Sequence, residues 1–197
     1  MTSPPASVDA DVAAAVETFD RHADTGALIR ALQEIAARAQ PDALVGAAAP
    51  FLDRPEIAGP LYERIVELRP NDARALVTLA NAYWLHGRGG EVVGDLAARA
   101  IAADPANRGA WHIWALSESD IRARVARWQQ VTARFPDDDL ARAILADNAT
   151  SLAGAEHDER ALALAIETYD DLLTRATRLE QREALEKALM TLKSWSL

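Results

Sequence analysis

Residues 70–105 read PNDARALVTLANAYWLHGRGGEVVGDLAARAIAADP, and this stretch decides the fold class. Apolar residues recur every three or four positions on both sides of a glycine-rich break at 86–90, a pattern typical of two amphipathic helices joined by a turn. Asn71 or Asp72 is suited to cap the first helix, and a proline at each end of the stretch closes a helix. These residues therefore predict a helical hairpin.

The same signals return along the chain. The segments LYERIVELRPND (61–72) and AARAIAADPAN (97–107) both end a helical pattern at a proline, and a further proline follows at position 136. The prolines at 70, 105 and 136 are 35 and 31 residues apart, near the period of about 34 residues that is typical of stacked helix–turn–helix units. The chain is therefore predicted to be an array of helical hairpins.

The hairpin at 70–105 resembles the tetratricopeptide repeat (TPR) family. That family places large apolar, small, tyrosine and proline residues at set positions, which are occupied here by Leu76, Leu79, Ala80, Tyr83, Val93, Ala97, Ala100 and Pro105. The resemblance covers residues 41–175 and is strongest in 70–105. It implies an all-α, TPR-like α-solenoid that presents a binding surface, and a fold of this kind does not by itself specify a reaction.

The helical pattern divides the chain into segments of one continuous folded unit. We expect a disordered N-terminus at 1–7, an N-terminal hairpin cap at 8–40, about four TPR-like units at 41–175, and a C-terminal capping helix at 176–197. Within the repeats, the predicted helices span 43–52 and 55–68, then the two helices of 70–105, a short helix that begins near Trp111, 121–135, and a last pair that starts after three aspartates at 137–139.

Composition narrows the function classes. Half of the 197 residues are hydrophobic and alanine is frequent, which favours helices packed through small residues over a sheet. The net charge of −9 and a pI near 4.9 disfavour binding to nucleic acid or to an anionic membrane. The chain has no cysteine, its N-terminus lacks a signal-peptide pattern, and no stretch is long and apolar enough to span a bilayer. We therefore expect a cytoplasmic protein.

The residues of catalytic and metal sites are sparse. None of the four histidines forms a metal-binding pair with another, and the nearest approach to a ligand cluster is His157-Asp158-Glu159 in a predicted turn. The three aspartates at 137–139 lack the glycine and distal glutamate of a calcium loop and are better explained as helix caps. No nucleophile elbow or phosphate-binding loop is present. We predict no enzyme activity, no cofactor and no resident metal.

The resemblance implies a concave groove lined by the first helix of each unit. The matching positions are Arg74, Val77, Thr78, Asn81, Trp84, Leu85, His112, Ile113, Leu116, Leu140, Ala143, Ile144 and Asp147. Trp84 follows the packing residue Tyr83 and has either a role as a peptide anchor or a place under the neighbouring hairpin. Trp111, Trp114 and Trp128 fall at core positions. Some TPR proteins grip a terminal carboxylate with basic groove residues, but only Asn81 and Arg74 match that set.

Three functions are compatible with this pattern. The first is an adaptor or scaffold that binds a protein or peptide, favouring basic partners because the chain is acidic. The second is a small-ligand protein or enzyme with an aromatic pocket around Trp84, Trp111 and Trp114. The third is a homodimer formed through the C-terminal helix, which ends in KSWSL. Four arginines at 122–134 form either a surface paired with nearby acids or an anion site.

Overall fold

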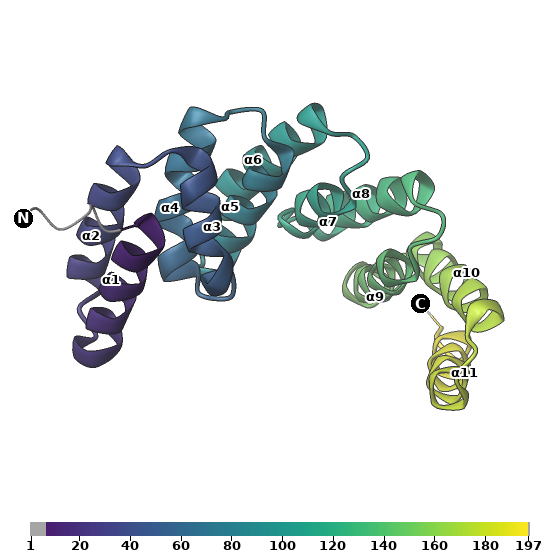
Figure 1. Ribbon diagram of the computed structural model, residues 1–197. Coiled ribbons are helices and arrows are strands. Elements are labelled where there is room, and N and C mark those ends of the chain that lie inside the picture. The colour runs from purple at the N-terminus through teal and green to yellow at the C-terminus, as the bar shows by residue number, and fades with distance from the viewer. Residues whose placement is uncertain (1–6, 197) are drawn as a thin grey trace, which may run out of the picture. The chain divides into compact units, whose positions relative to one another are not determined.

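A computed structural model describes residues 7–196, and throughout this range the chain forms helices joined by turns, without strands. The helices group into two compact units that divide between Ser117 and Glu118. Figure 1 shows the helices of each unit. The all-α fold class predicted from the apolar periodicity is confirmed.

Unit 1 contains three hairpins and the first helix of a fourth. Its helices are α1 (Val8–His22), α2 (Thr25–Arg38), α3 (Pro41–Ala48), the 3-10 turn η1 (Ala49–Phe51), α4 (Pro55–Leu68), α5 (Ala73–Leu85), α6 (Gly90–Ala103) and α7 (Arg108–Leu116). Consecutive helices from α3 to α7 pack on their neighbours, and α1 and α2 pack on α3 and α4 respectively. Each hairpin therefore buries the apolar face of the next, as expected for a repeat array.

Unit 2 contains α8 (Ile121–Arg134), α9 (Asp139–Glu156), α10 (Glu159–Arg175) and α11 (Leu179–Lys193). Helix α9 packs between α8 and α10, and α11 packs against α10. The predicted ends of α4 and α8 agree with the structure to within one residue, because each is marked by a cap or a proline. The unit boundary falls in the turn between α7 and α8, which the repeat register pairs as one hairpin.

Aspartate or asparagine side chains cap the N-termini of most of the described helices. A side-chain oxygen of the residue before the helix accepts a hydrogen bond from a backbone N–H of the first turn at Asp24, Asp72, Asn107, Asp120, Asp138 and Asp158. Caps of this kind typically stabilise a helix by about 1 kcal/mol each. The three aspartates at 137–139 therefore serve α9, where Asp138 is the cap and Asp139 lies in the first turn.

Two details of the predicted turns were wrong. The helix expected at 43–52 begins earlier, at Pro41, and becomes a 3-10 turn after Ala48, because Pro50 has no N–H to continue the α-helical hydrogen bonds. In the turn after α5, only Gly87 has a positive φ, of 69°, whereas Gly89 has φ −53°. Gly90 is needed for space, since a Cβ there would lie 2.4 Å from the backbone oxygen of Ser117.

A continuous apolar core runs through unit 1. It is built from large aliphatic side chains with almost no exposed surface, including Leu32, Leu44, Ile57, Leu61, Ile65 and Leu76. Val93 and Ala97 of α6 extend the same cluster to Ala110 and Ile113 of α7. Burial of each large side chain contributes about 1.5–3 kcal/mol, so this core is the main source of stability in unit 1.

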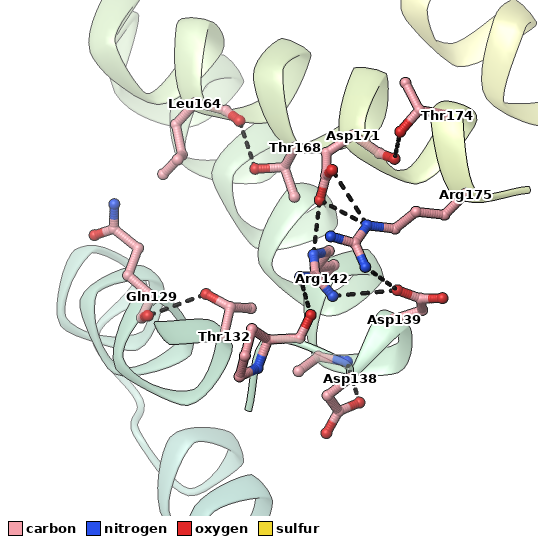
Figure 2. Close-up of polar contacts among 12 residues, drawn as sticks. Gln129, Thr132, Asp138, Asp139, Arg142, Leu164, Thr168, Asp171, Thr174 and Arg175 are labelled. Carbon is pink, nitrogen blue, oxygen red and sulfur yellow. Dashed lines mark hydrogen bonds and ion pairs between the residues drawn. The ribbon is translucent and has the colours of Figure 1, made fainter. Parts of the chain in front are cut away.

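Unit 2 contains a buried arginine with several partners (Figure 2). The guanidinium of Arg142 on α9 is 2.8 Å from Asp171 and 3.1 Å from Asp139, and it also donates to the backbone oxygen of Pro136. Arg175 lies 3.1 Å from the same Asp171 carboxylate. Because Arg142 is only 8% exposed, its charge is held by these neighbours and not by water. The network ties α9 to α10 and to the α8–α9 turn.

The sequence also predicted how the chain divides into larger segments. The N-terminal segment predicted to be disordered, 1–7, lies outside the described residues except for Ser7, whose side chain caps α1. The prediction of one continuous folded unit stays a prediction, and we describe each of the two units by itself. Within residues 7–196 no helix is long and apolar enough to cross a lipid bilayer.

Candidate functional site

The exposed face of α5 carries the largest group of predicted groove residues. Arg74, Asn81, Trp84 and Leu85 are exposed, and Val77 and Thr78 are half-buried between them. These residues recur at three- and four-residue spacing, so they form one stripe opposite the buried stripe of Leu76, Leu79 and Ala80. The structure therefore brings six of the predicted site residues together on a single helix face.

Two apolar side chains at the end of this stripe are open to solvent. Trp84 is 40% exposed and Leu85 is 63% exposed. The neighbouring hairpin in unit 1 therefore leaves a substantial part of the Trp84 ring uncovered. Tryptophan is one of the residue types that commonly form the energetic centre of a protein interface, and here it lies beside an exposed amide, Asn81.

Helix α7 lies beside α5 in the same unit and adds the second half of this surface. Gly109 at the start of α7 lies next to Val77 of α5, since a Cβ on it would be at ordinary van der Waals distance, 3.6 Å, from a methyl group of Val77. His112 is half-buried and Leu116 is 40% exposed, and the two are one helical turn apart. We call the exposed and half-buried residues along this side of both helices the α5–α7 face, namely Arg74, Val77, Thr78, Asn81, Trp84, Leu85, His112 and Leu116.

The other predicted groove residues lie elsewhere. Ile113 is 6% exposed and belongs to the core of unit 1, so its side chain faces away from solvent. Asp147 is on α9 in unit 2, where it accepts a hydrogen bond from the hydroxyl of Tyr169. Leu140, Ala143 and Ile144 are on the same helix. The helical pattern could not distinguish these positions, because neither burial nor the unit boundary is visible in a repeat register.

A polar cluster holds α5 against α4 next to this face. The hydroxyl of Tyr83 donates a hydrogen bond of 2.7 Å to Glu63 on α4, and the guanidinium of Arg88 lies 4.4 Å from the centre of the Tyr83 ring. Burial, together with the Glu63 carboxylate, raises the pKa of Tyr83 to about 12, so the phenol stays neutral and continues to donate. This contact fixes the residue immediately before Trp84, and it limits how far the end of α5 can move.

Trp111 and Trp114 contact each other at the base of α7. Their rings meet edge to face with centres 5.6 Å apart, and the Trp111 indole N–H donates to the backbone oxygen of Pro105. Trp114 also packs against the unit 1 core, and Trp128 is fully buried in unit 2. These contacts agree with the packing role predicted for the three tryptophans. An aromatic pocket formed by Trp84, Trp111 and Trp114 stays a prediction.

The arginines at 122–134 are engaged by neighbouring groups. Arg122 pairs with Glu156 and Asp158, Arg124 donates to Asn148 and to the backbone oxygen of Glu118, and Arg127 pairs with the Glu118 carboxylate. The hydrogen bond to Glu156 is the main reason why the pKa of Arg122 is raised. The hydrogen bond from the backbone N–H of Ala161 is the main reason why the pKa of Asp158 is lowered. Arg134 lies 5.4 Å from the centre of the Phe135 ring, so two of the four arginines, Arg122 and Arg127, fit the alternative of a surface paired with nearby acids.

The predicted ligand cluster His157-Asp158-Glu159 lies at the boundary between α9 and α10. His157 ends α9 in a left-handed conformation, with φ 52°, and Asp158 caps α10 by accepting from two backbone N–H groups. In the part of the chain that the structure describes, no three histidine, aspartate or glutamate side chains are grouped closely enough to hold a metal ion. The side chains of this turn therefore serve the helix ends.

Comparisons with known proteins identify the fold. No protein-family model matches the chain, and no curated protein sequence is similar enough to count as a relative. Solved structures are similar: a crystal structure of MamA protein has a TM-score of 0.59 at 15% identity, covering 87% of this chain and 97% of MamA. TTC0263, a thermophilic TPR protein in Thermus thermophilus, has a TM-score of 0.56 at 18% identity, covering 93% of this chain and 99% of TTC0263.

A solved structure of MamA from residue 41 to its end, from Desulfovibrio magneticus, is similar to the same degree, with a TM-score of 0.57 at 15% identity and coverage of 87% of this chain and 96% of that one. At these identities the likeness defines the fold alone. The protein has an all-α, TPR-like helical-repeat fold, as the residues of 70–105 predicted. Its function has to be argued from its own surfaces.

Proposed function

We propose that this protein is a non-enzymatic interaction module, an adaptor or scaffold, and that its α5–α7 face binds a segment of a partner protein. The observation that carries the proposal is the exposure of Trp84 and Leu85 beside Asn81 on one stripe of α5. Helical-repeat folds present extended surfaces of this kind, and the TPR fold of TTC0263 supports a protein partner as the class of ligand.

The chemistry of the face suggests the kind of segment that binds. Trp84, Leu85 and Leu116 supply apolar contact area, and Asn81, Thr78 and Arg74 supply hydrogen bonds to a partner backbone or side chain. The net charge of −9 favours partners with exposed lysine or arginine, because opposite charge raises the rate of encounter. A cytoplasmic location is part of this proposal and is expected from the sequence.

The proposal is tested by affinity capture from the source cell with the wild-type protein and a Trp84→Ala, Asn81→Ala double variant. Truncation of an interface tryptophan typically costs about 2 kcal/mol or more, or roughly a 30-fold loss in affinity. A captured protein should be lost from the double variant, and the loss should be reproduced by titration of the purified partner. Circular dichroism should show unchanged helical content, because neither side chain belongs to the core.

Val92→Ala provides the matched control. Val92 is 47% exposed and lies on α6, the second helix of the same hairpin, so its truncation removes a similar exposed apolar side chain away from the α5–α7 face. Binding that falls equally in both variants would contradict the proposal. A set of captured proteins that is the same for the wild type and the double variant would contradict it too.

Self-association through α11 is a second candidate, favoured by one observation. Met190 is 70% exposed and Leu179 is 71% exposed, whereas Leu189 and Leu192 on the same helix are buried. Exposed apolar side chains that form a contiguous patch mark interaction surfaces, and Leu179 and Met190 would have to belong to such a patch. Light scattering of the wild type and of Met190→Glu measures this directly: a dimer that becomes a monomer in the variant supports it, and a wild-type monomer rules it out.

A further inference from the structure

A second surface, on unit 2, has the features of a ligand pocket. A hollow of about 390 Å³ opens beside α11, and its lining residues are Thr150, Tyr169, Ala184, Lys187, Ala188, Thr191, Leu192 and Trp195. Ligand sites in proteins occupy about 300–1,000 Å³ and are lined mostly by apolar and aromatic groups with a few polar ones. This hollow is at the small end of that range and has the same composition.

The spacing of residues on α11 explains why the hollow exists. Ala184, Lys187, Ala188 and Thr191 lie one helical turn apart on one stripe, whereas Leu189 is buried on another part of the helix. Because the side chains of the two alanines are small, they leave space above the middle of the stripe. Leu192 forms the apolar floor of the hollow near the end of the stripe. A flat group can therefore lie against the helix without displacing a side chain.

Two aromatic side chains form walls of the hollow, and both are held in place. The hydroxyl of Tyr169 on α10 donates to Asp147 on α9, which fixes the orientation of the ring. The Trp195 indole packs on α9, with ring atoms 3.6 Å from the position that a Cβ on Gly154 would occupy, and its backbone N–H donates to Leu192. Because these rings are ordered before a ligand arrives, little conformational entropy is lost on binding.

Lys187 is the one lining residue that is charged at neutral pH. The chain contains two lysines beside nineteen arginines, and both lysines are on α11. Lys193 lies 3.4 Å from Asp170, whereas the Lys187 ammonium makes no ion pair or side-chain hydrogen bond with any residue from 7 to 196. The pKa of Tyr169 is raised to about 12, mainly by burial, so its phenol stays neutral and adds no negative charge to the hollow. The hollow therefore combines aromatic walls with one uncompensated positive charge.

We propose that this hollow binds a small aromatic carboxylic acid, with its ring between Tyr169 and Trp195 and its carboxylate on the Lys187 ammonium. The aromatic walls favour a planar ring through offset or edge-to-face contacts. The lysine favours an anion over a neutral or cationic group, because a carboxylate forms a charge-assisted hydrogen bond with it. Thr191, one turn from Lys187, also lines the hollow, and its hydroxyl donates to the backbone oxygen of Lys187, which leaves the ammonium as the donor for a carboxylate.

The test uses 2-naphthoate and its neutral analogue 2-naphthamide as probes, titrated into the full-length ¹⁵N-labelled protein. The signal is the indole N–H resonance of Trp195, identified by its absence in Trp195→Phe. A saturable shift is expected with both probes, and 2-naphthoate should bind about fivefold more tightly, which is the size of a partly exposed charge interaction.

Two lysine variants separate the proposed contact from a general charge effect. Lys187→Met should bind both probes with the same affinity, because it keeps the aliphatic chain and removes the ammonium. Lys193→Met, on the same helix and equally uncharged, should keep the fivefold preference for 2-naphthoate. Both side chains are on the surface of α11, so both variants are expected to fold, which circular dichroism checks.

Several results would overturn the proposal. They are the absence of a saturable Trp195 shift, equal affinity of the wild type for both probes, and a fivefold preference that survives in Lys187→Met. A Trp195 resonance that moves with protein concentration alone, together with a dimer in light scattering, would show that a second copy of the chain covers the hollow. The outcome is independent of the α5–α7 face, since the partner test uses variants in unit 1.

Discussion

Units 1 and 2 use the same structural element, an antiparallel helical hairpin, but different interactions hold the hairpins together. In unit 1 the fully buried side chains are large aliphatic ones, such as Leu44, Ile57 and Leu76, together with alanines, such as Ala80 and Ala97. In unit 2 the buried stripes of α9 and α10 consist largely of alanines, namely Ala141, Ala146, Ala149, Ala153, Ala161 and Ala165, and Arg142 lies among them. Small side chains let helices approach closely but bury less apolar area for each residue.

This difference shows that the same repeat of helical hairpins can be stabilised by different interactions in different parts of one chain. Helices α9 and α10 have 18 and 17 residues, longer than any helix of unit 1, and so they extend the line of small contacts. The ion pairs of Arg142 then supply specificity at one end of that line. Unit 2 is therefore expected to depend on a few polar contacts, and unit 1 on close apolar packing.

The largest expected effect is in unit 2. Arg142→Met should lower its free energy of unfolding by about 3 kcal/mol, because the charge-assisted hydrogen bonds of the guanidinium to Asp171, to Asp139 and to the backbone oxygen of Pro136 are all lost. Hydrogen exchange should rise throughout α9 and α10 and stay unchanged in α2 to α5. Arg175→Met is the control: Arg175 is 40% exposed and pairs with the same carboxylates, so its loss should cost less than about 1 kcal/mol. Equal effects of the two variants would contradict the distinction between the units.

A smaller effect is expected from close packing in unit 1. Gly90→Ala should lower the free energy of unfolding by about 2 kcal/mol, because the new methyl group meets the Ser117 backbone oxygen at 2.4 Å and a backbone atom cannot rotate away. Gly89→Ala is the control, since nothing lies within 4 Å of its added Cβ and its φ is −53°. Thermal unfolding of both variants measures the difference, and a neutral Gly90→Ala would show that α6 and α7 approach less closely.

The smallest effect concerns one half-buried carboxylate of unit 2, that of Asp158. The backbone N–H of Ala161 and the Arg122 guanidinium hold the pKa of Asp158 below its ordinary value of 3.8. A group whose pKa is lowered on folding stabilises the protein fully above its unfolded pKa and loses this contribution as pH falls through the folded value. Asp158→Asn should therefore lower the melting temperature at pH 7, and the difference should shrink once the pH falls below about 3.8. A difference that grows in acid would have the wrong sign.

Local signals predicted much of the helix architecture. Asp120 and Asp138 begin helices where capping residues precede an apolar pattern, and Pro55 begins one at the position that tolerates a missing N–H. Between α1 and α2, Ala23 adopts the left-handed conformation with φ 54°, and α2 already includes Thr25 and Gly26. No pattern in the sequence predicts a left-handed conformation at this alanine.

The candidate site was predictable only in part. The stripe of α5 from Arg74 to Leu85 follows from helical spacing, but its exposure depends on which neighbours cover it. Ile113 and Leu116 show this: they lie three residues apart on α7, and one is buried in the core whereas the other is 40% exposed. The hollow beside Lys187 left no motif in the sequence either, since it is formed by residues of α9, α10, α11 and Trp195.

By itself, the sequence determined the fold class and most helix ends of this protein, because amphipathic periodicity, caps and prolines act through contacts within a few residues of the chain. Only the tertiary structure decided where the chain divides into units, which apolar side chains stay exposed, and that Arg142 is buried among carboxylates. Those properties arise from packing between helices that are distant in sequence, and a degenerate repeat pattern is compatible with many such packings.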